Sequence, residues 1–110
     1  MNFIIREAVK EDMPQVLELI KELAAFEKLP DAVEITVADL QKDGFQNPPL
    51  FICFVAEVNL KIEGIALVFN RYSTWKGKTI HLEDLIVKER MRGSGLGYQL
   101  YTAVIEQGRK

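Results

Sequence analysis

Arg92-Gly93-Ser94-Gly95-Leu96-Gly97 is a glycine-dense stretch between a strand-like run, Ile80 to Val87, and a helix-like run, Tyr98 to Gln107. Glycines let successive backbone N–H groups point into one space, because no side chain blocks the approach. The start of a helix adds unpaired N–H donors and a partial positive charge. The stretch therefore predicts a cradle for a ligand that carries a phosphate or pyrophosphate.

The spacing of the glycines excludes two familiar nucleotide motifs. A P-loop ends in Gly-Lys-Ser/Thr, whereas Gly97 is followed by Tyr98. A dinucleotide fingerprint needs a third glycine where Tyr98 or Leu100 stands, and an acidic residue about 20 positions further on. What remains is R-x-x-G-x-G running from a strand into a helix. The alternative is an ordinary tight connection in which the glycines only permit the turn.

Length and composition indicate one soluble globular domain over residues 1–110, with 48% hydrophobic and 27% charged residues. No apolar run approaches the roughly 20 residues of a membrane span. The first residues lack the features of a signal peptide. Cys53 has no second cysteine to pair with and lies in an apolar run, which favours a core residue. We expect a cytoplasmic protein that does not bind membranes.

Charge is unevenly distributed along the chain. Residues 1–43 hold ten acids and five bases, a net charge of −5, whereas residues 44–110 hold six acids and nine bases, a net charge of +3. The glycine stretch lies in the basic part, as a polyanionic ligand would favour, and the acidic part could attract a polycation. Solvated helix faces that happen to differ explain most of these charges equally well. The absence of a basic stripe argues against a nucleic-acid partner.

The hydrophobic pattern predicts the order β-α-α-β-β-β-α. Asp12 is the expected N-cap of a first helix that reaches about Phe26, and Thr36 with Asp39 resembles a capping box for a second. We expect a turn over 59–63 and another over 73–77. The expected strands cover 3–6, 50–58, 64–72 and 78–87, and the last helix begins at 94 or 95. This order predicts an α/β (α+β) domain with a mixed, mainly antiparallel sheet flanked by helices.

The last strand carries an acidic pair, Glu83-Asp84, in otherwise apolar surroundings. Strict alternation would place Ile80, Leu82, Asp84 and Ile86 on one face, and Thr79, His81, Glu83, Leu85 and Val87 on the other. A carboxylate in a covered strand is costly unless it is paired or functional. A hydrogen bond to loop amides or an ion pair would satisfy either group. The functional interpretation is that Glu83 binds an amine or helps to deprotonate it.

No metal site is predicted, because His81 is the only histidine and neither a second histidine nor a cysteine lies near it. His81 could shuttle protons beside Glu83, although a lone histidine in a strand is more often structural.

Arg92, Gly95 and Gly97 fill the fixed positions of the Q/R-x-x-G-x-G/A loop, so the stretch resembles the acetyl-CoA pyrophosphate loop of GNAT-type N-acetyltransferases. Other segments are similar to the spermidine/spermine (diamine) N-acetyltransferase branch. They are Ile20-Lys21-Glu22-Leu23-Ala24 with Phe26-Glu27, Asp39-Leu40, Asp43-Gly44-Phe45, Val55-Ala56-Glu57-Val58, Trp75-Lys76-Gly77-Lys78 and Leu82-Glu83-Asp84.

The resemblance implies transfer of the acetyl group of acetyl-CoA to a primary amine of a small polyamine or diamine, by direct attack. It implies that Glu83, the catalytic candidate, contacts the amine together with Phe26 and Glu27. Phe26 stands where the branch more often has tyrosine. The cofactor would be bound by Leu85, Ile86 and Val87 through their backbone, and by Arg92, Gly93, Ser94, Gly95, Leu96, Gly97 and Tyr98 at the pyrophosphate.

The chain departs from the resembled pattern after residue 108. Members usually continue with a strand, a helix bearing a tyrosine that protonates the leaving sulfur, and a terminal hairpin, which we expect to be absent here. A fragment of a larger enzyme, completion of the sheet by a second chain, or a non-catalytic CoA-binding or interaction module would each explain this. The last strand would form an exposed edge, which predicts a homodimer.

Overall fold

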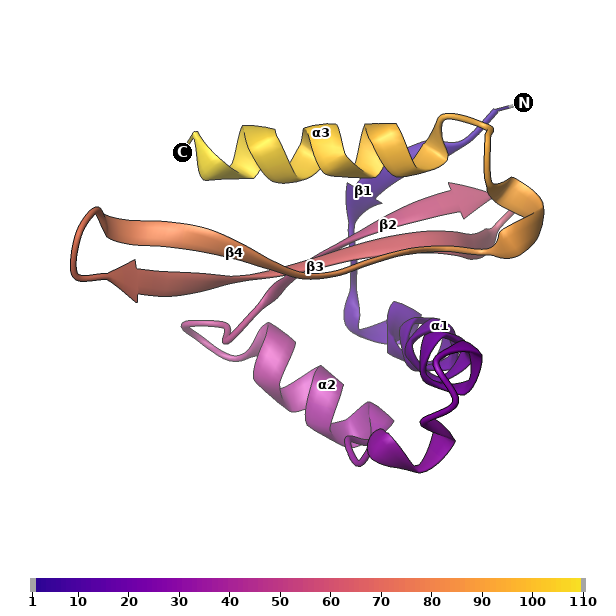
Figure 1. Ribbon diagram of the computed structural model, residues 1–110, viewed down its shortest axis with the longest axis horizontal. Helices are drawn as coiled ribbons and strands as arrows, with labels where there is room; N and C mark the ends of the chain where they lie inside the picture. The colour runs from indigo at the N-terminus through magenta and orange to yellow at the C-terminus, as the bar shows by residue number, and fades with distance from the viewer. Residues whose placement is uncertain (1, 110) are drawn as a thin grey trace.

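The computed structural model describes residues 2–109 and has the predicted order of elements (Figure 1). The strands and helices are β1 (Ile4–Glu7), α1 (Met13–Phe26), α2 (Val37–Phe45), β2 (Ile52–Val58), β3 (Lys61–Ser73), β4 (Gly77–Val87) and α3 (Leu96–Gly108). Three short 3₁₀ turns, η1 (Lys10–Asp12), η2 (Pro30–Ala32) and η3 (Glu89–Met91), join some of them. The described part contains no helix long and apolar enough to cross a membrane.

The strands form one sheet in the order β1-β2-β3-β4, and all of its described pairings are antiparallel. The mainly antiparallel α/β fold predicted from the sequence is therefore confirmed. α1 and α2 cover one face of the sheet and α3 covers the other (Figure 1). β4 pairs with β3 on one side and, within residues 2–109, with no strand on the other. In the described part of the chain the outer edge of β4 is therefore open.

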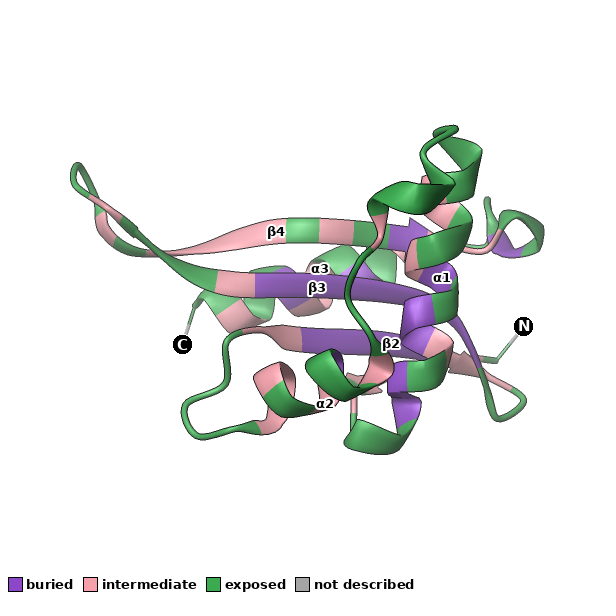
Figure 2. Cartoon of the chain, turned by 90° about the horizontal axis from the view of Figure 1, so that it is seen from below, coloured by how far each residue is buried: buried purple, intermediate pink, exposed green. Residues whose placement is uncertain are grey.

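A hydrophobic cluster fills the space on each side of the sheet. Burial follows the middle of β2 and β3 and the inner side of α1, and the long β3–β4 hairpin extends beyond it (Figure 2). The cluster beneath α1 and α2 is built from Met13, Val16, Leu17, Leu19, Leu40, Cys53, Val55, Ile62, Ile65 and Ile86. The cluster beneath α3 is built from Phe54, Ala56, Ala66, Val68, Met91, Leu96, Leu100 and Val104. Burial raises the pKa of the Cys53 thiol to about 12, in keeping with the predicted core residue.

Two β-bulges interrupt the sheet, and each leaves a glutamate without an opposite residue. On β3 the extra residue is Glu63, and on β4 it is Glu83, because Leu67 lies opposite Asp84 whereas Val68 lies opposite Leu82. The strict alternation expected for β4 is therefore wrong. Before the bulge, Ile80 and Leu82 pack against the α3 cluster, whereas Ile86 belongs to the α1 cluster. One inserted residue exchanges the two faces of a strand.

α3 approaches the sheet closely at Gly64. A Cβ at this position would lie 2.6 Å from Leu96 Cδ2 and 3.1 Å from Leu100 Cδ1. Because carbon atoms pack at about 3.5–4.0 Å, a side chain at this position would require Leu96 and Leu100 to shift, and glycine avoids this. The contact holds the first turn of α3 over the sheet beside the end of β4.

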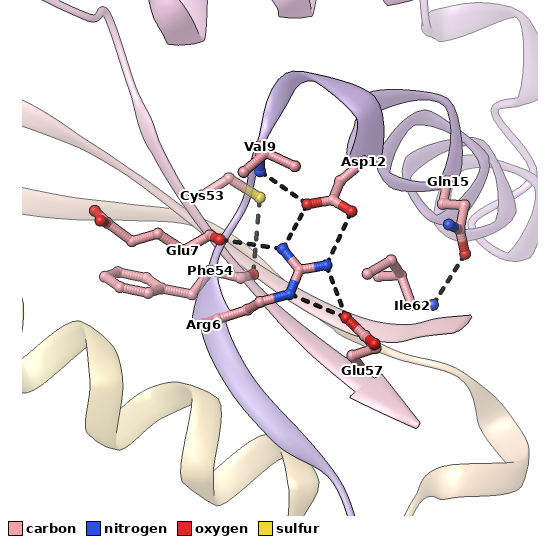
Figure 3. Close-up of polar contacts among 9 residues, drawn as sticks. All are labelled: Arg6, Glu7, Val9, Asp12, Gln15, Cys53, Phe54, Glu57 and Ile62. Atoms are coloured by element: carbon pink, nitrogen blue, oxygen red, sulfur yellow. Dashed lines mark hydrogen bonds and ion pairs between the residues drawn. The ribbon is translucent and has the colours of Figure 1, made fainter. Parts of the chain in front are cut away.

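Arg6 links β1 to η1 through Asp12 and to β2 through Glu57 (Figure 3). Its Nη1 donates to Asp12 Oδ2 at 2.7 Å and its Nη2 to Glu57 Oε1 at 2.8 Å. The Asp12 carboxylate also accepts a hydrogen bond from the Val9 N–H at 2.8 Å. Asp12 occupies the expected N-cap position of α1, but its side chain holds the preceding turn and Arg6 instead of the helix. Arg6 lowers the pKa of Asp12 below its usual range.

The capping box of α2 and the hairpin turn between β2 and β3 were both predicted from the sequence, and the structure agrees with the first but shortens the second. The capping box is confirmed, since the Asp39 N–H donates to Thr36 Oγ1 at 3.1 Å and the Thr36 N–H donates to Asp39 Oδ2 at 2.9 Å. The turn expected over 59–63 is shorter, because β3 already begins at Lys61. Asn59 and Leu60 both have positive φ, 50° and 67°, as a two-residue hairpin turn requires.

Candidate active site

The glycine stretch forms a turn that ends as the N-terminus of α3. Gly95 is the N-cap residue, with φ 89° and ψ −1°, a left-handed conformation that favours glycine. Its carbonyl accepts the Gln99 N–H at 3.1 Å, which starts the helix. Ser94 Oγ donates to the Met91 carbonyl at 2.6 Å and accepts the Leu96 N–H at 3.3 Å. The Ser94 hydroxyl therefore stabilises the turn through hydrogen bonds to backbone groups on both sides of it.

The turn leaves backbone donors facing a hollow. Within residues 2–109 the N–H groups of Gly97 and Tyr98 donate no hydrogen bond, as expected for the first turn of a helix. A hollow of about 310 Å³ lies beside them, lined by Val87, Met91, Arg92, Gly93, Gly95, Gly97 and Tyr98. Donors at a helix start, an arginine and an open hollow suit a phosphate or pyrophosphate. We call this hollow the cradle.

A larger groove of about 880 Å³ adjoins the cradle and shares Val87 and Arg92 with it. The end of α1 forms one wall, and the end of β4 with η3 forms the other. Its lining is Glu22, Leu23, Phe26, Lys61, Ile86, Val87, Lys88, Glu89, Arg90 and Arg92.

The buried Glu63 ties η3 to the sheet. Its carboxylate pairs with Arg90, and its carbonyl accepts the Lys88 N–H at 2.9 Å. Only 3% of the Glu63 side chain is exposed, so the bulge on β3 places a buried anion under a turn rich in cations. The ion pair satisfies this carboxylate and fixes the segment that leads into the cradle.

The open edge of β4 presents the backbone of Leu85 and Val87. In an antiparallel pair the hydrogen-bonded and non-hydrogen-bonded positions alternate. The hydrogen bond from Lys88 to Glu63 makes that pair a bonded one, so Ile86 bonds to Ile65, whereas Leu85 and Val87 turn their N–H and C=O groups outward. Of the three residues predicted to bind the cofactor through their backbone, Leu85 and Val87 have that backbone available.

Three carboxylates gather where α1 ends beside the β4 bulge. Glu83 is exposed, and Asp84 is about half-buried. Burial raises the pKa of Asp84, and the neighbouring charges of Glu83 and Glu27 raise it further. Asp84 was not among the predicted site residues, because strict alternation separated it from Glu83. The bulge between Leu82 and Asp84 breaks that alternation.

Phe26 lines the groove, and His81 packs against Phe69 within the β3–β4 hairpin. The Phe26 ring centroid is 5.9 Å from Arg92 Cζ, and both residues line the groove. The ring of His81 packs against Phe69 at 4.9 Å between centroids, which agrees with a structural histidine. Within residues 2–109 no group of His, Cys, Asp and Glu could hold a metal ion.

An antiparallel sheet whose fourth strand leads through a glycine turn into a helix N-terminus, with carboxylates further back along the same strand, defines the class of GNAT-fold acyltransferases. The sequence profile of the acetyltransferase (GNAT) family matches residues 10–110, and the chain belongs to this family. The predicted resemblance is confirmed.

The chain is similar to proteins whose names concern N-acetyltransferases. The chain is 44% identical over 105 residues to the human spermidine/spermine N(1)-acetyltransferase-like protein 1, which covers 89% of this chain and 15% of that protein. It is 42% identical over 115 residues to the thialysine N-epsilon-acetyltransferase of Bos taurus, covering 96% of this chain and 68% of that protein. The chain thus spans a small part of the first relative and about two thirds of the second.

Solved structures share the fold at lower identity. An aminoglycoside acetyltransferase from an uncultured soil metagenomic sample superposes with a TM-score of 0.78 at 24% identity, covering 97% of this chain and 70% of that one. A transcriptional regulator from Bacillus halodurans C-125 superposes with a TM-score of 0.79 at 21% identity, covering 98% and 75%. At these identities the likeness concerns the fold alone.

Proposed function

We propose that the chain catalyses transfer of the acetyl group of acetyl-CoA to a primary amine of a small polyamine or diamine. One observation carries the proposal: β4 has the cradle at its end and the carboxylates Glu83 and Asp84 a few residues back, near Glu27, which follows the last residue of α1. A phosphate-bearing acyl donor and a cationic acceptor would therefore meet along one strand. The names of the two curated relatives, which concern thialysine and spermidine/spermine, support an amine acceptor.

The donor would be bound by backbone groups. The N–H groups of Gly97 and Tyr98, the dipole of α3 and Arg92 would hold the pyrophosphate. The outward N–H and C=O groups of Leu85 and Val87 would pair with the amides of the pantetheine arm, in the manner of an added strand. This arrangement would direct the thioester back along β4 toward the bulge.

The carboxylates would bind and activate the acceptor. In the reaction the amine nitrogen forms a bond to the thioester carbon, the carbon–sulfur bond breaks, the CoA thiolate leaves, and the nitrogen gives up a proton. Asp84 has a raised pKa, which brings it closer to the pH at which a general base works well. Glu83 and Glu27 would hold the ammonium groups of a polyamine. The alternative prediction is that Glu83, in place of Asp84, takes the proton from the amine, directly or through a water.

Turnover tests the proposal. We expect release of CoA thiol from acetyl-CoA to depend on spermidine or a diamine, with thialysine as a comparison acceptor. Glu83→Gln and Asp84→Asn should each lower kcat/KM for the amine by about 10²–10⁴-fold if the residue is the base, and by less if it only binds charge. Glu106→Gln on the far end of α3 is the matched control and should leave the kinetics unchanged.

Three outcomes would contradict parts of the proposal. Saturable acetyl-CoA binding without amine-dependent turnover would favour the alternative, a non-catalytic CoA-binding module. Turnover that depends on thialysine but not on polyamines would move the substrate to an amino-acid side chain. Unaltered kinetics in both carboxamide variants would remove the carboxylates from the site.

A cytoplasmic location and a homodimer remain predictions. Within residues 2–109 the outer edge of β4 before Leu85 pairs with no strand, and its backbone groups could pair with those of a second copy without displacing the pantetheine arm. Sedimentation at rising protein concentration should show a dimer, and monomers throughout would contradict this expectation.

A further inference from the structure

The end of α1 contacts the arginine of the cradle. Phe26 is the last residue of α1, and its ring centroid lies 5.9 Å from the guanidinium carbon of Arg92. This distance falls within the range of a cation–π contact. The ring is 75% exposed and belongs to neither hydrophobic cluster. Core packing therefore does not account for its position.

Arg92 lies where orientation matters. It lines both the groove and the cradle, and it follows η3, which the Glu63–Arg90 ion pair fixes to the sheet. The backbone before Arg92 is thus anchored, whereas its long side chain is exposed and has many rotamers to lose on binding an anion. A ring beside the guanidinium restricts that freedom before the ligand arrives.

We infer that Phe26 is a positioning residue for the acyl donor: its ring holds the Arg92 guanidinium at the mouth of the cradle, ready to pair with the pyrophosphate. This inference rests on the proposed function for the identity of the ligand. It differs from the role that the resemblance implied, in which Phe26 lines the amine site. Since Glu27 follows Phe26 and its charge raises the pKa of Asp84, the end of α1 lies near both halves of the site.

The expected effect follows from the strength of an exposed cation–π contact. Phe26→Leu keeps an apolar side chain but removes the aromatic face, so acetyl-CoA affinity should fall about 2–5-fold, equivalent to about 0.5–1 kcal/mol. Phe26→Tyr keeps the aromatic face and should restore the affinity of the parent chain. The KM of the amine should stay unchanged in both variants.

A double-mutant cycle with Arg92→Gln tests the coupling. Acetyl-CoA dissociation constants are measured by calorimetry for the parent chain, Phe26→Leu, Arg92→Gln and the double variant. Leu29→Ala, an exposed apolar residue just beyond α1 that lines neither the groove nor the cradle, is the control. We expect Phe26→Leu to have no effect once Arg92 is replaced, and the melting temperature to stay within the range of the control.

Other results would overturn the inference. Additive effects in the cycle would mean that Phe26 does not act through Arg92. A raised KM for the amine alone in Phe26→Leu, whether or not tyrosine restores it, would return the residue to the amine site. If the parent chain does not bind acetyl-CoA at all, the proposed function fails first. If the parent chain binds acetyl-CoA and Phe26→Leu binds it with the same affinity, the positioning role of Phe26 is rejected and the proposed function is not.

Discussion

Replacing Gly95 by alanine would place a Cβ on a residue with φ 89° without creating a clash, because no atom lies within 4 Å of that Cβ. The effect is therefore one of backbone conformation alone. A left-handed conformation costs an L-residue roughly 1–2 kcal/mol, and the lower entropy of the unfolded alanine chain returns about 0.4–1 kcal/mol. We expect Gly95→Ala to lower the free energy of unfolding by about 0.5–1 kcal/mol.

Gly108→Ala is the matched control in the same helix. Gly108 has no positive φ, and its Cβ would also meet nothing within 4 Å. Alanine there should stabilise the chain by up to about 1 kcal/mol through helix propensity. The two variants carry the same chemical change and should move in opposite directions. The two free-energy changes together amount to about 1–2 kcal/mol, so their melting temperatures should differ by about 4–16 °C, at about 4–8 °C per kcal/mol for a domain of this size.

Thermal and urea unfolding followed by circular dichroism measure both variants, and calorimetry with acetyl-CoA follows. Gly95→Ala should also weaken acetyl-CoA binding, since a shifted turn moves the N–H groups of Gly97 and Tyr98. If Gly95→Ala proves as stable as Gly108→Ala, Gly95 does not hold a left-handed conformation in solution. The cradle geometry derived from it would then be refuted.

Asp84→Asn should be more stable than the parent chain at pH 7 while losing activity. The folded pKa of Asp84 is raised, so stability is lost as the pH rises through it, and the difference should vanish near pH 3 and shrink with salt. Asp12→Asn should cost about 1.5–3 kcal/mol at neutral pH, because a charged hydrogen bond to Arg6 is lost. Since the pKa of Asp12 is lowered, that deficit should shrink as the pH falls below about 4, which urea titrations across pH would show. Gly64→Val should lower the free energy of unfolding by about 1–3 kcal/mol through overpacking against Leu96, and an unchanged urea midpoint would contradict the close approach of α3.

Features set by neighbouring residues could be predicted from the sequence. Thr36 and Asp39 are three residues apart, and their capping box depends on nothing beyond that spacing. The strand–glycine–helix order around Gly95 is equally local, and it located the cradle. The GNAT fold followed from motifs that extend over most of the chain.

Features set by distant contacts could not be predicted. No pattern within β4 reveals the bulge at Glu83, because it depends on the register of β4 against β3. Because of that bulge, residues on its two sides do not follow one strict alternation, and Asp84 was not predicted as a site residue. Asp12 stands where a helix N-cap is expected, but its carboxylate forms an ion pair with Arg6 on β1 instead of capping the helix. The turn at Asn59 contains Leu60 where Asn-Gly would have been a clear signal.

The place of β1 in the sheet has a consequence for how the chain folds. β2, β3 and β4 follow one another through short turns, whereas Arg6 reaches Glu57 across 51 positions that include α1 and α2. Closing a long loop costs more entropy than closing a short one, and contacts of high sequence separation form late. We expect the three-stranded meander to form first and β1 to dock last. Pulse-labelled hydrogen exchange should then protect the Ile65 amide before that of Arg6, which faces Val55 in a hydrogen-bonded pair, and the reverse order would assign the folding nucleus to the N-terminal half.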